Sequence, residues 1–127
     1  MSEILILDDE PSVRGFFRAV LEGAGYSVEE ASTARDAFQI LRERPMDLVM
    51  TDILMPDMDG LEVTRTLRRE FPGVKIIAVS GAQQDIDYRT VARFLGADDT
   101  LLKPVTVQDL QDAVARLLGR PADPPSA

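Results

Sequence analysis

The sequence contains no cysteine and no histidine. Without cysteine the chain can form neither disulfides nor thiolate metal sites, and it has no thiol nucleophile. Without histidine it lacks the commonest transition-metal ligand, the commonest general base and any phosphohistidine of its own. A metal ion bound by this chain must therefore be held by oxygen, and the cytoplasm is the expected compartment.

Long apolar runs and positive charge are also scarce. The first apolar run, residues 4–7, ends in an acidic triplet, whereas a membrane span needs about 20 apolar residues and a secretory signal needs a basic start. The 22 acidic and 14 basic side chains give a net charge of −8. Because nucleic acid and anionic membranes repel such a chain, we expect it to bind neither directly.

What is present suffices for one compact domain. The chain has 127 residues, of which 45% are hydrophobic, enough to build a core without disulfides or metals. We expect the domain to cover residues 1–119. Residues 120–127 hold three prolines and no apolar period, which indicates a disordered tail or linker remnant and leaves open a stand-alone protein or a longer regulator.

Short apolar runs alternate along the chain with segments of helical spacing. Strands are expected at residues 4–7, 26–28 (the weakest), 48–50, 76–79 and 101–102. Helices are expected at about residues 13–24, 34–44, 61–70, 86–95 and 107–118. The last helix has the clearest limits, because Thr106 with Asp109 forms a capping-box variant at its start and Gly119 marks its end.

Strands that alternate with single helices through short connections pair in parallel with right-handed crossovers. The sequence thus predicts an α/β fold, a five-stranded parallel sheet with helices on both faces in a three-layer (βα)5 sandwich. In such a sheet the functional site lies beyond the carboxyl ends of the strands. Polar residues follow four of these ends: Asp8, Asp9, Asp52, Ser80 and Lys103.

Each of these residues alone has an ordinary structural explanation, such as a helix N-terminal charge, a turn or a solvated surface lysine. Together they indicate a site. Like charges about 4 Å apart cost about 4 kcal/mol at an effective dielectric near 20, so clustered carboxylates need a cation. Oxygen ligands with room for water suit Mg²⁺, with Mn²⁺ as the alternative.

A phosphoryl group fits the remaining charge balance. A metal ion and Lys103 can neutralise phosphoryl oxygens while a carboxylate attacks in line and Ser80 donates a hydrogen bond. We expect Asp52 to be the nucleophile, because a lone acid on the central strand faces Lys103 whereas the pair Asp8 and Asp9 forms a natural metal clamp.

The motifs formed by these residues resemble the receiver domain of two-component response regulators. They are Ile6-Leu7-Asp8-Asp9-Glu10, Asp52-Ile53-Leu54-Met55-Pro56 with Asp59-Gly60, Ser80, and Lys103-Pro104. The resemblance covers about residues 3–119 and implies the flavodoxin-like strand order 2-1-3-4-5.

The resemblance also implies a role for each site residue. Asp52 is then the phospho-acceptor and a metal ligand. Asp9 binds Mg²⁺ directly, Asp8 acts mostly through water, and Leu54 contributes its backbone carbonyl.

The remaining roles concern the phosphoryl group. By the resemblance, Lys103 binds the phosphoryl oxygens, Ser80 is the switch hydroxyl and Ala82 belongs to the same phosphoryl-binding segment. The Lys103–Pro104 bond is expected to be cis, against a general rate of about 5–6% for such bonds.

A receiver domain accepts its phosphoryl group from a sensor histidine kinase, a phosphotransfer protein or a small donor such as acetyl phosphate. We therefore expect a phospho-acceptor rather than a turnover enzyme, acting on a downstream protein target or on an output domain outside these residues. A monomer or weak dimer is expected.

The sequence departs from the family at Thr100 and Val105, where receivers commonly carry aromatic residues. The usual movement of an aromatic side chain at Thr100 cannot operate here. The hypothesis is that signalling proceeds instead through reordering of the loop from Ser80 to Asp85 and of the fourth helix.

Three other functions are compatible with an α/β fold of this kind. An aspartate-nucleophile phosphatase needs an Asp-x-Asp arrangement on its first strand, which Asp8-Asp9-Glu10 does not supply. A flavin or dinucleotide carrier needs a Gly-rich or hydroxyl-rich phosphate loop there, and this loop is acidic. An interaction module with the receiver fold that signals without phosphorylation remains the alternative.

Overall fold

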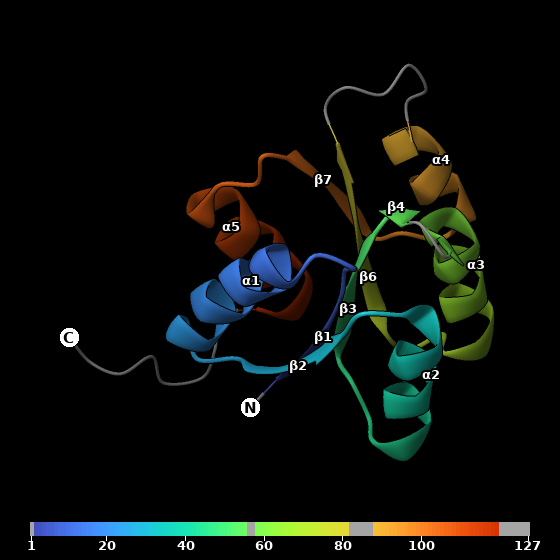
Figure 1. The fold of residues 1–127 in the computed structure, drawn as a ribbon, viewed down its shortest axis with the longest axis horizontal. Helices are drawn as coiled ribbons and strands as arrows, with labels where there is room; N and C mark the ends of the chain where they lie inside the picture. Colours follow the sequence, from blue (N-terminus) through green and yellow to red (C-terminus); the bar gives the residue numbers. More distant parts are fainter. Residues whose placement is uncertain (1, 56–57, 82–87, 120–127) are drawn as a thin grey trace.

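The computed structural model describes residues 2–55, 58–81 and 88–119, in which strands and helices alternate along the chain (Figure 1). The elements are, in chain order, β1 (Glu3–Leu7), α1 (Pro11–Gly23), β2 (Ser27–Ala31), α2 (Ala34–Glu43), β3 (Leu48–Asp52), β4 (Leu54–Met55), β5 (Met58–Asp59), α3 (Gly60–Glu70), β6 (Lys75–Gly81), α4 (Tyr88–Leu95), β7 (Asp99–Lys103) and α5 (Val107–Leu118).

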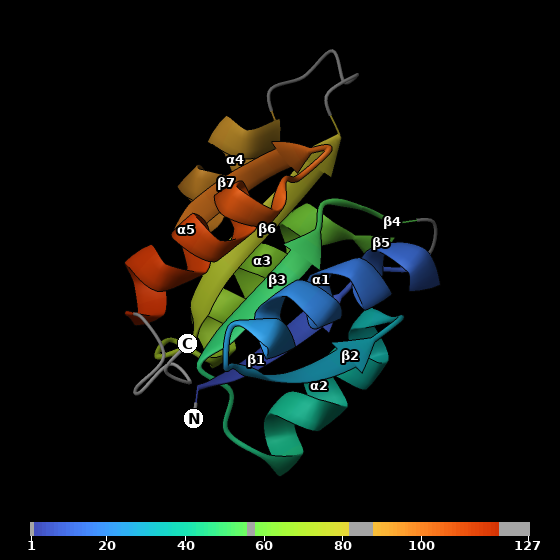
Figure 2. The same ribbon diagram turned by 90° about the vertical axis from the view of Figure 1, so that its left-hand side faces the viewer.

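The main sheet is parallel throughout, in the order β2-β1-β3-β6-β7 (Figure 2). Counted along the chain, these five strands have the predicted order 2-1-3-4-5, and the predicted fold is confirmed. β4 and β5 form a separate antiparallel pair immediately after β3. No helix within the described residues is long and apolar enough to cross a membrane.

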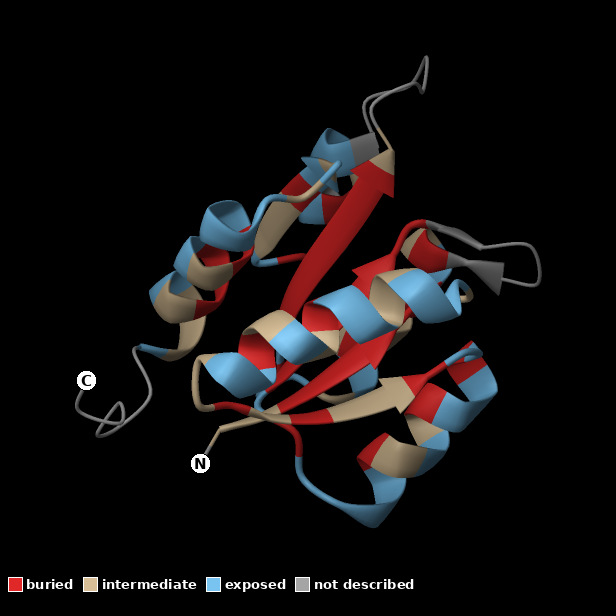
Figure 3. Ribbon diagram, turned by 60° about the vertical axis from the view of Figure 1, so that its left-hand side comes forward, coloured by how far each residue is buried: buried red, intermediate tan, exposed pale blue. Residues whose placement is uncertain are grey.

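Helices cover both faces of the sheet, α1 and α5 on one side and α2, α3 and α4 on the other (Figure 1). Because successive side chains of a strand point to opposite faces, Ile4 and Ile6 pack with the α1/α5 layer, whereas Leu5 and Leu7 pack with the other three helices. Figure 3 shows the central strands as almost wholly buried. Each large side chain buried there contributes about 1.5–3 kcal/mol.

Threonine caps fix the starts of two helices. Thr33 Oγ1 accepts a hydrogen bond from the backbone N–H of Asp36 at 3.1 Å, and Thr106 Oγ1 accepts one from Asp109 at 3.0 Å. A cap of this kind is worth about 1 kcal/mol. The predicted limits of α5 are confirmed at both ends, since Gly119 follows it as the C-terminal cap.

The strands extend further than the apolar runs that predicted them. β3 ends at Asp52, β6 includes Ser80 and β7 ends at Lys103, because ladder hydrogen bonds use backbone groups and do not require apolar side chains. No sequence pattern predicts the pair β4–β5, because its two-residue strands are too short to show a period. The expected start of the fourth helix at residue 86 and the tail 120–127 lie outside the described residues.

Candidate functional site

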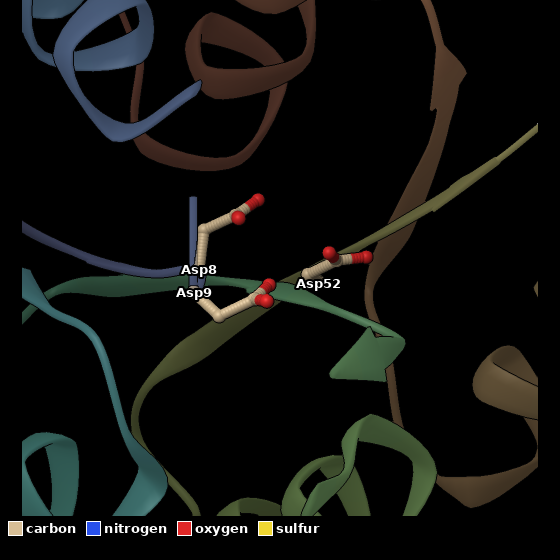
Figure 4. A group of neighbouring side chains, drawn as sticks. All are labelled: Asp8, Asp9 and Asp52. Carbon is tan, nitrogen blue, oxygen red and sulfur yellow. The ribbon is translucent and has the colours of Figure 1, made fainter. Parts of the chain in front are cut away.

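Three aspartates meet at the carboxyl edge of the sheet. Asp8 and Asp9 directly follow β1, and Asp52 ends β3, its neighbour in the sheet, where Leu7 pairs with Thr51. One oxygen from each carboxylate lies within 4.8 Å of the others. Figure 4 shows the three side chains as near neighbours, Asp8 and Asp9 from the end of β1 and Asp52 from the end of β3. The parallel topology thus brings together residues that are 43 positions or more apart, as the sequence predicted.

Two of the three acids are buried. Asp8 is 1% exposed and Asp52 is 6% exposed, while Asp9 is the more open of the three. Asp8 Oδ1 accepts the backbone N–H of Glu10 at 2.9 Å. Its other oxygen, Oδ2, is buried and accepts no hydrogen bond from any described group. A buried carboxylate oxygen without a hydrogen-bond donor is costly, and its one ion-pair contact, with Lys103 at 3.5 Å, leaves room for a metal ion to bind it more closely.

Lys103, at the end of β7, supplies positive charge from the far side of the site. Its Nζ lies 3.2 Å from Asp52 Oδ2 and 3.5 Å from Asp8 Oδ2. Burial alone lowers the pKa of this ammonium, but the carboxylates of Asp52 and Asp8 outweigh burial, so the pKa lies above its ordinary value. One ammonium against three carboxylates leaves two negative charges, which matches a divalent cation.

Ser80 and Pro104 complete the edge. Ser80 is buried in β6, one position beyond Val79, which pairs with Asp52, so the sheet places Ser80 at the same carboxyl edge as Asp52. The peptide bond between Lys103 and Pro104 is cis, the isomer that the resemblance implies. It turns the chain from β7 toward α5 directly after the ammonium-bearing residue.

Gly60 packs against the backbone that carries Asp52. Its N–H donates to the carbonyl of Ile53 at 2.8 Å. A Cβ at this position would lie 2.2 Å from the carbonyl oxygen of Asp52 and 2.4 Å from the Cα of Ile53. Only glycine allows this approach, which gives the Asp59-Gly60 motif a physical reason that the sequence alone did not reveal.

Arg14 is a further residue at the site that the sequence did not single out. From α1, its Nη1 donates a hydrogen bond to the backbone carbonyl of Asp8 at 2.7 Å, and its Nε contacts Glu30 on β2 at 3.1 Å. The only signal was position, since an arginine in the first turns of a helix can reach back to the loop before it. No motif marks that contact.

Four further positions are singled out by the sequence: Leu54, Ala82, Thr100 and Val105. Leu54 begins β4, and the role of its carbonyl stays a prediction, while Ala82 lies outside the described residues. Thr100 Oγ1 lies 3.4 Å from Arg93 Nη2 of α4. Val105 packs, partly buried, on the core beneath α1 and α5.

The donor set fits a hard divalent ion. Carboxylate oxygens, one of them buried without a donor, are the ligands that Mg²⁺ prefers. Asp8, Asp9 and Asp52 could hold the ion. The Lys103 ammonium could bind an anionic group next to that ion. The sequence predicted this grouping correctly, and the structure adds Arg14 and Gly60 as supports.

Comparison with known proteins agrees with this geometry. Residues 4–115 match the model of the response regulator receiver domain. The response regulator MprA of Mycolicibacterium vanbaalenii is 37% identical over 92% of this chain and 50% of its own length. The KDP operon transcriptional regulatory protein KdpE of Escherichia coli is 38% identical over 87% of this chain and 48% of its own.

A solved receiver domain from Clostridium thermocellum is similar in structure, with a TM-score of 0.85, 32% identity and coverage of 93% of this chain and 94% of that one. The chain spans about half the length of the two full-length relatives. The matched residues include the three carboxylates and the lysine described above. The chain therefore belongs to the response regulator receiver domain family of two-component systems.

Proposed function

We propose that this chain accepts a phosphoryl group on Asp52, with Mg²⁺ bound at the same edge of the sheet, and passes the signal on by changing conformation. One observation supports this most directly. Three carboxylates converge within 4.8 Å, and a single ammonium lies 3.2 Å from Asp52 Oδ2. That arrangement attracts one divalent cation and one phosphoryl group together.

Asp8, Asp9 and Asp52 would hold the ion through carboxylate oxygens, with the Leu54 carbonyl as a further ligand. The bound ion supplies positive charge that neutralises phosphoryl oxygens during transfer. The unsatisfied Oδ2 of Asp8 supports this role, because it is buried and faces the cluster.

Asp52 would act as the nucleophile. A carboxylate oxygen of Asp52 forms a bond to phosphorus as the P–N bond of a donor phosphohistidine breaks. The electron pair of that bond stays on the imidazole nitrogen, which takes up a proton. Because these residues include no histidine, the phosphohistidine would lie outside them, on a sensor histidine kinase or a phosphotransfer protein; acetyl phosphate could also serve as donor, with acetate as the leaving group.

Lys103 and Ser80 would bind the transferred group. The raised pKa of Lys103 keeps its ammonium charged across the physiological range, so it can exchange its contact with Asp52 for one with a phosphoryl oxygen. The buried Ser80 hydroxyl can donate a second hydrogen bond from β6.

The chain would then work as a stoichiometric switch, not as a turnover enzyme, and would control a downstream protein or an output domain. We propose that output involves α4 and the segment from Ser80 to Asp85, of which residues 82–85 lie outside the described residues. In support, Thr100 contacts Arg93 of α4 through its hydroxyl instead of carrying an aromatic ring. Amide exchange in α4 should change on activation, and unchanged exchange there would exclude this route.

The test of phosphorylation is intact-mass measurement after incubation with acetyl phosphate, with and without Mg²⁺. Three chains are compared: the wild type, Asp52→Asn and Asp112→Asn, which removes the same charge from an exposed position of α5. We expect one Mg²⁺-dependent phosphoryl adduct on the wild type and on Asp112→Asn, and none on Asp52→Asn.

The opposite results are equally informative. An adduct that survives in Asp52→Asn would contradict the assignment of the acceptor. No adduct on any chain, under conditions in which a known receiver is phosphorylated, would favour an interaction module that signals without phosphorylation.

A further inference from the structure

We propose that Arg14 is a positioning residue for the metal ligands Asp8 and Asp9, and that Glu30 neutralises Arg14 so that its charge does not oppose the ion. The inference rests on the Mg²⁺ site proposed above. It assigns to α1 and β2 a role in metal binding, although neither element supplies a ligand.

The first observation behind this proposal is the hydrogen bond from Arg14 to the backbone carbonyl of Asp8. Its Nη1 donates at 2.7 Å to the carbonyl oxygen of Asp8, and this carbonyl belongs to the peptide unit that joins Asp8 to Asp9. Fixing the oxygen of that unit fixes its plane, and the plane sets the direction in which the Asp9 side chain leaves the backbone.

The other bonds on this loop do not replace that contact. The N–H of Asp8 donates to the carbonyl of Ala31 at 3.2 Å, and Asp8 Oδ1 accepts from Glu10 at 2.9 Å. The first of these holds Asp8 to the end of β2, and the second folds its own side chain over the loop. Among the described side chains, Arg14 is the one that donates a hydrogen bond to the peptide unit between Asp8 and Asp9.

Glu30 holds the guanidinium in place. Arg14 Nε lies 3.1 Å from Glu30 Oε1, and Arg18 Nη1 lies 2.9 Å from Glu30 Oε2. Glu30 pairs with Ile6 in the sheet, so it projects from a rigid strand. A guanidinium is planar and donates in fixed directions, so binding Glu30 through Nε determines where Nη1 points.

Glu30 also compensates the positive charge of Arg14. A cation packed against a metal-binding loop repels Mg²⁺ unless an anion accompanies it. The hydrogen bond from Arg18 holds the pKa of Glu30 below its usual value, so Glu30 stays ionised at neutral pH. Arg18 is itself paired with Glu22 at 3.2 Å, and the four side chains together carry no net charge.

The test is the Mg²⁺ affinity of the unphosphorylated chain, measured by titrating MgCl2 and following amide shifts. Arg14→Gln is compared with the matched control Arg18→Gln, which loses an ion pair to the same glutamate on the same helix but leaves the Asp8 carbonyl contact intact. Loss of outer support for metal ligands typically weakens affinity by 10–100-fold. We expect roughly tenfold weaker binding for Arg14→Gln and less than about a twofold change for Arg18→Gln.

Two readouts separate positioning from general damage. In the metal-free protein, the amides of Asp9 and Glu10 should exchange faster in Arg14→Gln than in Arg18→Gln. With acetyl phosphate, the phosphorylation rate of Arg14→Gln should fall at low Mg²⁺ and return close to that of the wild type at saturating Mg²⁺. A defect that persists at saturation would overturn the positioning role.

A second variant tests the charge argument even if Arg14→Gln does not fold. Glu30→Gln keeps an oxygen that can accept from Arg14 but no longer neutralises it. Its Mg²⁺ affinity should be reduced, and more so at low ionic strength, where charges are least screened. Affinity that is unchanged at low salt would overturn this part.

Different results would contradict the positioning role of Arg14 and the proposed phosphorylation of Asp52. A wild-type chain that binds no Mg²⁺ overturns both. A wild type that binds Mg²⁺ and is phosphorylated, with Arg14→Gln and Arg18→Gln equal in affinity, overturns this inference alone.

Discussion

The two ends of the same sheet handle charge in opposite ways. At the carboxyl end, Asp8, Asp9 and Asp52 converge on one ammonium. At the amino end, Arg68 of α3 meets Asp98, which precedes β7, in an ion pair. One end thus carries an excess of negative charge, whereas this pair at the other end is balanced.

The amino-end pair is also saturated with hydrogen bonds. Arg68 donates to the carbonyl of Gly96 through Nε at 3.0 Å and Nη2 at 2.8 Å, and Asp98 Oδ2 accepts the N–H of Ile76 at 2.8 Å. These contacts tie α3, α4 and β6 together. The amino end thus balances even a partly exposed ion pair, whereas the carboxyl end leaves two buried aspartates with one ammonium between them, an imbalance that fits an end which binds a cation.

The largest expected effect comes from breaking the close packing under Asp52. Gly60→Ala would place a Cβ 2.2 Å from the Asp52 carbonyl oxygen, and overpacking against backbone costs about 3 kcal/mol or more. Urea unfolding should show that loss. Gly15→Ala is the matched control, because a Cβ there meets nothing within 4 Å in α1, and it should stabilise by up to about 1 kcal/mol. A Gly60→Ala chain as stable as the wild type would refute the close approach.

The second-largest expected effect is a loss of stability at the amino end of the sheet, where Arg68 pairs with Asp98. Asp98→Ala removes the acceptor of both Arg68 and the N–H of Ile76, and losing charge-assisted hydrogen bonds of this kind costs about 2 kcal/mol. Asp112→Ala, which loses one exposed contact with Gln108, should stay within about 0.5 kcal/mol of the wild type. Equal stabilities for the two variants in urea would contradict the view that the amino end is a structural clamp.

The smallest effect is a pH dependence from Glu30. The pKa of Glu30 is lowered in the folded chain, first by its hydrogen bond with Arg18, so its contribution to stability is present above its ordinary pKa and lost as the pH falls through the folded value. The wild type should exceed Glu30→Gln by about 0.5 kcal/mol at pH 7. That difference should begin to fall near pH 4.5, the ordinary value, and disappear once the pH is below the lowered folded value, and a difference that grows in acid would contradict the ion pairs.

Much of this molecule could be predicted from its sequence because the signals are periodic or topological. Apolar spacing gave the helices, Thr106 gave the start of α5, and the parallel sheet placed Asp8, Asp52 and Lys103 at one edge. The edge strand β2 was the weakest prediction, since Glu29 and Glu30 interrupt its apolar pattern to meet arginines.

The supports of the site could not be predicted in this way. The contact from Arg14 to the Asp8 carbonyl depends on how α1 rotates relative to the loop before it, which no residue pattern encodes. The need for glycine at residue 60 appears only when α3 is seen to begin against the backbone of Asp52. Both are contacts with backbone atoms, which leave no signature in the side chains around them.

The charge imbalance at the carboxyl end implies that this end gives up stability in order to bind a cation. The most direct measurement is the free energy of unfolding of the wild type and of Asp8→Asn, each with and without Mg²⁺. Asparagine keeps an oxygen for the Glu10 N–H but relieves repulsion from Asp9 and Asp52, which outnumber the one attraction to Lys103.

Without Mg²⁺ we therefore expect Asp8→Asn to be the more stable chain, by about 1 kcal/mol. With Mg²⁺ at about 100 times its dissociation constant, the wild type should gain about 2.7 kcal/mol and the variant much less, so that the order reverses. If Mg²⁺ stabilised both chains equally, or neither, the carboxyl end would not be the cation site that its charge imbalance indicates.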